Sequence, residues 1–139
     1  MNDFIPVNEP LLNGNEKKYL SECIDTGWIS SEGPFVKRLE ENFAKRKYGI
    51  AVCNGTAALE AAVIALGINI RDEVIMPTFT IISCASAVIR AGGIPVLVDS
   101  CTDTWNMNTD QIESKITDKT KAIMAVHIYG LPVNMNPLI

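Results

Sequence analysis

The segment Asn54-Gly55-Thr56-Ala57 has the residue types that bind phosphate at the start of a helix. It follows an apolar run at 50–53 and precedes an alanine-rich stretch. The first turn of a helix has unpaired N–H groups and the positive end of the helix dipole, so it attracts anions. Gly55 lets the backbone approach a ligand, and Thr56 adds a hydroxyl. Turns between a strand and a helix also use small residues for packing alone, so these residues by themselves leave both interpretations open.

The residues that commonly bind metals lack the spacing of a metal site. The four cysteines lie at 23, 53, 84 and 101 without a C-x-x-C pair, and His127 is the only histidine. We therefore expect no metal site. Cys53 and Cys84 lie in apolar segments, where cysteine behaves as a small hydrophobic residue. This use of cysteine is typical of a reduced, cytoplasmic protein.

Short apolar strands alternate with helices along the chain, a pattern typical of an α/β fold whose mostly parallel sheet is covered by helices. The spacing of apolar residues predicts strands at 50–53, 73–76, 94–98 and 121–128, hence a four-stranded core. It predicts helices at 14–26, from Pro34 onward, at 56–66 and 80–91, and a short one from 108. The 56–66 segment is apolar on nearly every side, so we expect it to be buried.

The composition is that of a soluble globular protein. The chain has 139 residues, of which 47% are hydrophobic and 20% charged, and its net charge is −4. This charge disfavours a nucleic-acid partner, and no apolar run is long enough to span a membrane. The basic residues between 37 and 47 are interrupted by Glu40 and Glu41, which indicates a solvated helix face. Asn136-Pro137 predicts a further helix start where the sequence stops, so we expect the front part of a longer protein.

Four segments in a fixed order resemble a known enzyme family. They are GWISSEGPFVKRLEENFA at 27–44, VCNGTAAL at 52–59, VIMPTFTIISCASAVIRAGGIPVLVD at 74–99 and KAIMAVHIYGLPVNMNP at 121–137. Together they resemble the pyridoxal-phosphate-dependent sugar aminotransferases of the DegT/DnrJ/EryC1/StrS family, particularly the perosamine-synthase branch. The resemblance runs from about residue 5 to the end of the chain. It implies the N-terminal portion of the fold-type-I large domain at 35–139, incomplete, preceded by a helix and loop at 1–34.

The resemblance also assigns roles to the cofactor-binding residues. Gly55, Thr56 and Ala57 match the turn that holds the phosphate of pyridoxal 5'-phosphate. Thr80 and Ile81 match the segment beside the pyridine ring. Several relatives have an aromatic residue at the position of Ile81, so apolar packing is expected to replace ring stacking here.

Other residues receive weaker assignments. Trp28 and Ser30 belong to a loop that resembles the substrate-facing edge of relatives, although packing is an equal explanation for Trp28. His127, Tyr129 and Asp99 lie at predicted strand ends. For His127 and Asp99 we favour a structural role, a hydrogen-bonded histidine and a cap, over acid or base chemistry.

The resemblance implies amination of a nucleotide-linked 4-keto-6-deoxy sugar by an amino donor such as glutamate, in a cytoplasmic homodimer. This chemistry requires a lysine for the Schiff base and an acid at the pyridine nitrogen. No lysine of this chain matches the family's catalytic one, so residues 1–139 alone are expected to be inactive. Two alternatives stay open: a pyridoxal-phosphate-dependent sugar dehydratase of the same family, or a non-catalytic product, either truncated or half of a split enzyme.

Overall fold

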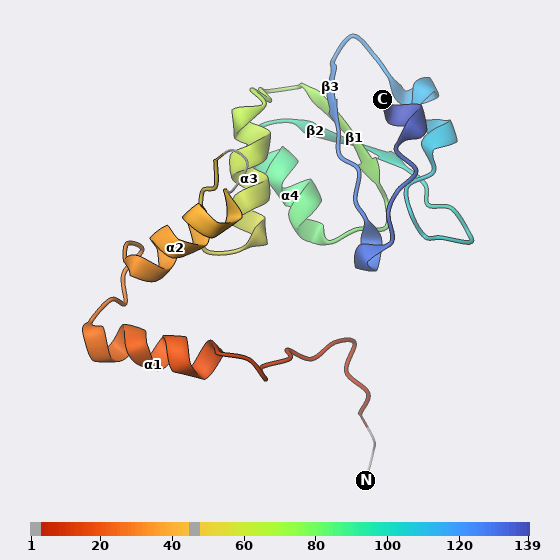
Figure 1. Ribbon diagram of the computed structural model, residues 1–139. Coiled ribbons are helices and arrows are strands. Elements are labelled where there is room, and N and C mark those ends of the chain that lie inside the picture. Colours follow the sequence, from red (N-terminus) through yellow and green to blue (C-terminus); the bar gives the residue numbers. More distant parts are fainter. Residues whose placement is uncertain (1–3, 45–47) are drawn as a thin grey trace. The chain divides into compact units, whose positions relative to one another are not determined.

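The computed structural model describes residues 4–44 and 48–139 (Figure 1). Contacts divide the chain into two compact units, Met1–Ala51 and Val52–Ile139, which are described separately. The basic residues at 45–47 lie outside the described part. The domain boundary between 34 and 35 concerns the whole protein and stays a prediction.

The first unit contains two helices, α1 (Glu16–Thr26) and α2 (Pro34–Phe43). They are joined by an aromatic and cationic cluster: the Tyr19 and Phe35 rings lie 5.2 Å apart, and the Arg38 guanidinium lies 4.8 and 4.5 Å from their centroids. Such cation–π contacts attract electrostatically. Lys37 and Glu41 form an exposed i,i+4 pair at 3.8 Å, in agreement with a solvated face on α2.

The strand expected at 50–53 does not form, so that prediction is wrong. The segment is described without strand structure, and the Ala51 N–H donates to Glu40 Oε1 at 2.8 Å. A strand exists only where a neighbouring strand accepts and donates its backbone hydrogen bonds. No such neighbour pairs with these residues in the described part of the chain, and Glu40 takes one of the N–H groups instead.

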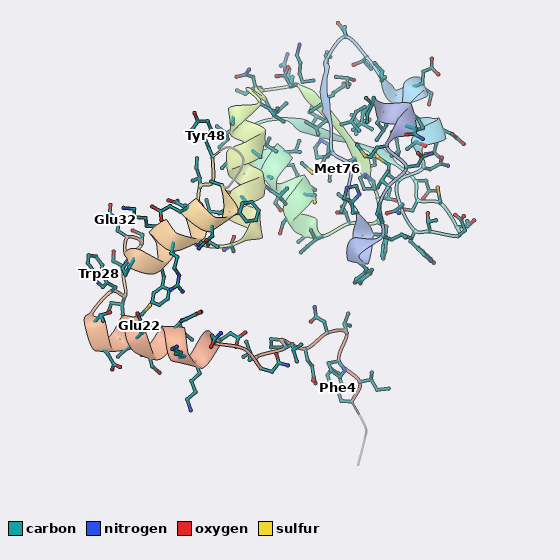
Figure 2. All side chains as sticks on the ribbon, viewed as in Figure 1. Phe4, Glu22, Trp28, Glu32, Tyr48 and Met76 are labelled. Carbon is teal, nitrogen blue, oxygen red and sulfur yellow. The ribbon has the colours of Figure 1, made fainter. Side chains whose placement is uncertain are left out.

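The second unit is built on three parallel strands in the order β2-β1-β3, not the four expected. These are β1 (Glu73–Pro77), β2 (Ile94–Val98) and β3 (Thr120–Ile123). The central strand, β1, is buried on both faces, with Val74, Ile75 and Met76 at most 1% exposed. Met76 is labelled in Figure 2. This burial explains its unbroken apolar run. Because all three strands are parallel, the loops that follow them meet at one edge of the sheet.

Two helices, α3 (Gly55–Ala65) and α4 (Ile82–Arg90), cover one face of the sheet (Figure 1). Their shared core consists of Val63, Ile68, Val74, Ala87 and Val88. Gly93, just after α4, is required by this packing, because a Cβ there would lie 2.8 Å from the Ile68 side chain and 3.1 Å from that of Val88.

The other face of the sheet is covered by irregular structure. Its core consists of Ile75, Val98, Met107, Ile112 and Val133. In place of the short helix expected from 108 there are two separate 3-10 turns, Thr109–Gln111 and Glu113–Lys115. Two further 3-10 turns lie at Ile128–Gly130 and Asn136–Leu138.

The structure corrects three further expectations, two about burial and one about the length of a strand. Only Val63 of α3 is buried, and Ile64 is 65% exposed, because α4 and the sheet cover a single side of this helix. Cys53 is exposed since no strand encloses it, whereas Cys84 is 3% exposed within α4. β3 ends at Ile123, five residues before the predicted end, because its pairing with β1 reaches only Ile75.

Candidate functional site

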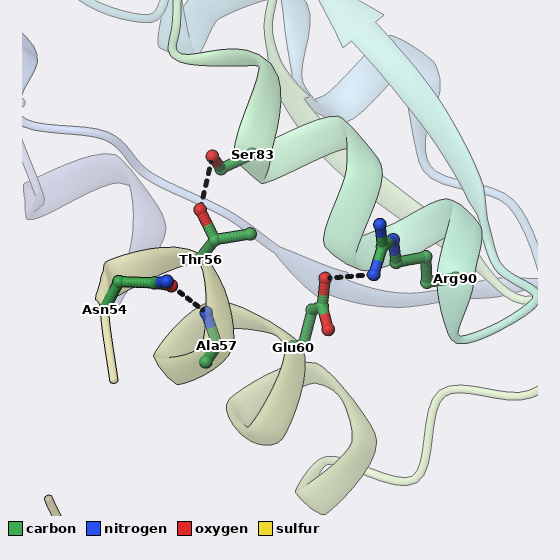
Figure 3. Close-up of polar contacts among 6 residues, drawn as sticks. All are labelled: Asn54, Thr56, Ala57, Glu60, Ser83 and Arg90. Carbon is green, nitrogen blue, oxygen red and sulfur yellow. Dashed lines mark hydrogen bonds and ion pairs between the residues drawn. The ribbon is translucent and has the colours of Figure 1, made fainter. Parts of the chain in front are cut away.

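The start of α3 combines a side-chain cap with unpaired backbone donors. Asn54 is the N-cap, and its Oδ1 accepts from the Ala57 N–H at 2.9 Å (Figure 3). The N–H groups of Gly55 and Thr56 have no acceptor among the described residues. The two donors at the positive end of the helix are therefore available to an anion. Ala57 would share its N–H with Asn54 if it also bound that anion.

Gly55 leaves the approach to these donors open. A Cβ built at Gly55 meets nothing within 4 Å, and its φ is not in the left-handed region. Neither packing nor backbone conformation within this chain therefore requires glycine at this position. Glycine in a helix costs roughly 0.5–1 kcal/mol relative to alanine. The open space beside Gly55 fits a phosphate that contacts the unpaired N–H groups of this turn.

The starts of α3 and α4 are joined by a pair of hydroxyls. Thr56 Oγ1 and Ser83 Oγ lie 2.8 Å apart, and either can donate (Figure 3). Farther along, Glu60 Oε1 and Arg90 Nη1 are 3.1 Å apart. The starts of both helices consequently lie at one place, beyond the carboxyl end of β1.

Thr80 and Ile81 precede α4 instead of forming its first turn, which corrects the helix expected at 80–91. Ile81 has an extended backbone with ψ of 139°, so the helical conformation begins only at Ile82. Thr80 Oγ1 donates to Cys84 Sγ at 3.3 Å. Ile81 is the N-cap residue in an extended conformation and is 61% exposed. Its side chain is thus available to contact a ligand.

Trp28 and Ser30 both lie in the first unit, in the loop after α1. Trp28 is labelled in Figure 2. Trp28 is 51% exposed and borders a hollow of about 650 Å³ together with Pro34, Val36 and Glu40. Ser30 is exposed and does not line this hollow. A substrate-binding role for the two residues stays a prediction.

His127 has the structural hydrogen bond that we favoured, whereas Asp99 makes only a local contact. The Val133 N–H donates to His127 Nδ1 at 3.0 Å, so the proton of the neutral ring is on Nε2. Asp99 Oδ1 accepts from the N–H of the adjacent Ser100 at 2.8 Å. Asp99 is not the N-cap of any described helix, so the cap expected there is not observed.

An aromatic cavity that the sequence did not predict lies at the carboxyl edge of the sheet. It measures about 420 Å³ and is lined by Phe79, Thr104, Trp105, Ile128, Tyr129 and Leu131. Phe79 lies 5.5 Å from Trp105 and 6.5 Å from Tyr129, ring centre to ring centre. Trp105 and Tyr129 have left-handed backbone conformations, with φ of 60° and 48° respectively. Such strain costs about 1–3 kcal/mol per residue and often marks a functional site.

Asn106 connects the two loops that carry this cavity. It is 5% exposed, and its Nδ2 donates to Leu131 O at 3.2 Å and to Pro132 O at 3.1 Å. Strand order adds a topological reason for a site here: the chain goes from β1 to β2 on one side and reaches β3 on the other. Open α/β sheets bind ligands where the connections diverge in this way. The signal in the sequence was an aromatic residue in the loop after each of the three strands.

Within residues 4–44 and 48–139, no group of three or more His, Cys, Asp or Glu side chains is arranged to hold a metal ion. In the same part of the chain, no helix is both long and apolar enough to cross a membrane.

Comparison with known proteins identifies the family. The model of the DegT/DnrJ/EryC1/StrS aminotransferase family matches residues 10–139. The chain belongs to this family. The turn at 54–57, capped by Asn54, and the segment at 77–81 between β1 and α4 both lie within the matched residues.

Individual family members share both sequence and fold with this chain. It is 48% identical over 139 residues to GDP-perosamine synthase of Escherichia coli O157:H7, with 98% of this chain and 38% of that protein covered. For GDP-perosamine synthase of Vibrio cholerae the identity is 45% over 137 residues, covering 96% and 37%. The sugar aminotransferase Spr1654 of Streptococcus pneumoniae, in its PMP form, superposes with a TM-score of 0.86 at 32% identity, covering 96% of this chain and 34% of that one. The chain thus spans little more than a third of the length of the relatives it matches. Structures similar to it have been solved in both PLP and PMP forms.

Proposed function

We propose that this chain forms the phosphate-binding part of a pyridoxal-phosphate-dependent aminotransferase that acts on a nucleotide-linked 4-keto-6-deoxy sugar. The observation that carries the proposal is the pair of unpaired N–H groups at Gly55 and Thr56, with open space beside Gly55. Membership of an aminotransferase family supports the choice of cofactor over other phosphate compounds.

Residues at the start of α3 would bind the phosphate of the cofactor, and residues at the start of α4 would contact its ring. The N–H groups of Gly55 and Thr56, with the Thr56 hydroxyl, would donate to the phosphate in the positive field of α3. Ile81 would cover one face of the ring with apolar surface, and Thr80 would border the ring. When bound, pyridoxal phosphate supplies an electron sink for the carbon whose bonds change.

The lysine that forms the Schiff base is, in this proposal, not among the lysines of residues 1–139. Lys119 and Lys121 flank the start of β3, at the opposite edge of the parallel sheet from Gly55 and Thr80. A side chain at that edge cannot reach a ring held at the carboxyl ends of the strands. We accordingly propose that 35–139 is the first part of the cofactor-binding domain and is inactive alone.

The substrate and the setting are inferred from the relatives. Two of them are named GDP-perosamine synthase, which supports a nucleotide-linked sugar as acceptor and an amino acid such as glutamate as donor. Trp28 and Ser30 are proposed to contact that substrate. Exposed apolar residues at the end of α3, Ile64 at 65% and the C-cap residue Leu66 at 68%, support a homodimer. The four free cysteines support a reducing, cytoplasmic setting.

The test of this function is cofactor affinity of the protein at its natural length after Thr56→Ala. A hydroxyl donating to a charged phosphate contributes roughly 1.5–3 kcal/mol, so binding should weaken about ten- to a hundredfold. Thr102→Ala is the matched control, because Thr102 is exposed and its hydroxyl has no partner in the described structure. Unchanged affinity in Thr56→Ala would show that the turn serves packing and would contradict the proposal.

A further inference from the structure

The hydroxyl pair between α3 and α4 raises the question of which oxygen donates. Thr56 Oγ1 and Ser83 Oγ are 2.8 Å apart and partly buried, 27 residues apart in the sequence (Figure 3). Each hydroxyl has one proton and two lone pairs. If Thr56 donated to Ser83, Thr56 would have no proton left for an anion. If Ser83 donates to Thr56, the Thr56 proton is free.

The surroundings of Thr56 decide between these arrangements. Thr56 lies in the first turn of α3, where its own N–H and that of Gly55 are unpaired. An anion bound there favours a hydroxyl proton pointing toward it. A Ser83 hydroxyl that donates to Thr56 Oγ1 also polarises the Thr56 O–H bond, because linked hydrogen bonds strengthen one another.

We propose that Ser83 is a positioning residue for the phosphate site: its hydroxyl donates to Thr56 Oγ1 and orients Thr56 as a donor to the cofactor's phosphate. The proposal rests on the proposed function. Ser83, on α4, would act on the phosphate site through Thr56 without contacting the phosphate itself.

Holding the two helices together does not require this hydrogen bond. α3 and α4 also share the buried side chains of Val63, Ala87 and Val88, and the ion pair between Glu60 and Arg90. Loss of the Ser83 hydroxyl should therefore leave the packing in place and remove only the orientation of Thr56.

The experiment compares the affinities of pyridoxal phosphate and of phosphate-free pyridoxal in the protein at its natural length. Ser83→Ala should weaken binding of the phosphate form about two- to tenfold, as expected for one neutral hydrogen bond, and leave pyridoxal binding unchanged. Ser83→Cys, with a weak donor, should show the same loss, and Ser83→Thr should restore affinity. Ser86→Ala on the same helix is the control, since the Ser86 hydroxyl has no partner in the described structure, and it should change neither affinity.

A double-mutant cycle completes the test. In a Thr56→Ala background, Ser83→Ala should have no further effect on phosphate-form affinity, because its action passes through Thr56. Equal losses for pyridoxal and its phosphate, or additive losses in the cycle, would overturn the role of Ser83. If Ser83→Ala keeps full affinity while Thr56→Ala weakens binding, the role of Ser83 is overturned and the proposed function stands. If Thr56→Ala also keeps full affinity, both the role of Ser83 and the proposed function are overturned.

Discussion

Substituting Gly55 should move stability and cofactor affinity in opposite directions. A Cβ at this position meets nothing within 4 Å, and the backbone is not left-handed. Gly55→Ala therefore introduces no clash and reduces the freedom of the unfolded chain. We expect it to raise the free energy of unfolding by about 0.4–1 kcal/mol.

The same substitution should weaken cofactor binding, because the new side chain occupies the space through which a phosphate reaches the backbone. Gly55→Val adds a bulkier, branched group and should shield one N–H from the phosphate. Loss of one charge-assisted hydrogen bond is worth roughly 1.5–3 kcal/mol, which corresponds to about a ten- to hundredfold loss of affinity. Gly55→Ala should fall between the wild type and Gly55→Val.

The assay pairs urea denaturation without cofactor with a titration of pyridoxal phosphate, followed by the visible absorbance of the bound cofactor. Ala61→Val on the exposed side of α3 is the control for added bulk: it should leave affinity unchanged. Equal affinities in the wild type and both Gly55 variants would refute a backbone–phosphate contact at this turn. A fall in stability for Gly55→Ala would refute the inference that the chain itself does not require glycine here.

Two further outcomes are expected. Asn106→Ala removes two hydrogen bonds, from its Nδ2 to Leu131 O and to Pro132 O, each worth about 0.5–1.5 kcal/mol, so the free energy of unfolding should fall by about 1–3 kcal/mol; an unchanged urea midpoint would contradict this role. The protein at its natural length should be a homodimer by light scattering, because apolar side chains such as Ile64 and Leu66 are exposed here; a monomer at high concentration would count against it.

Local signals in the sequence were sufficient for several elements. The apolar runs at 73–76 and 94–98 predicted β1 and β2 to within one residue, and their parallel pairing is confirmed. The turn at Asn54-Gly55 predicted the start of α3, because a capping side chain and the helix that it caps are neighbours in sequence. Family membership also followed from the order of four motifs and is confirmed by the match to residues 10–139.

Tertiary structure alone decided whatever depends on partners distant in the sequence. The run at 50–53 has strand composition, but a strand requires a neighbour, and the Ala51 N–H bonds to Glu40 instead. The apolar character of α3 did not determine its burial, because burial depends on which elements pack against it. The 2.8 Å contact between Thr56 and Ser83 likewise follows from where the sheet places the starts of two helices, and no local pattern encodes that distance.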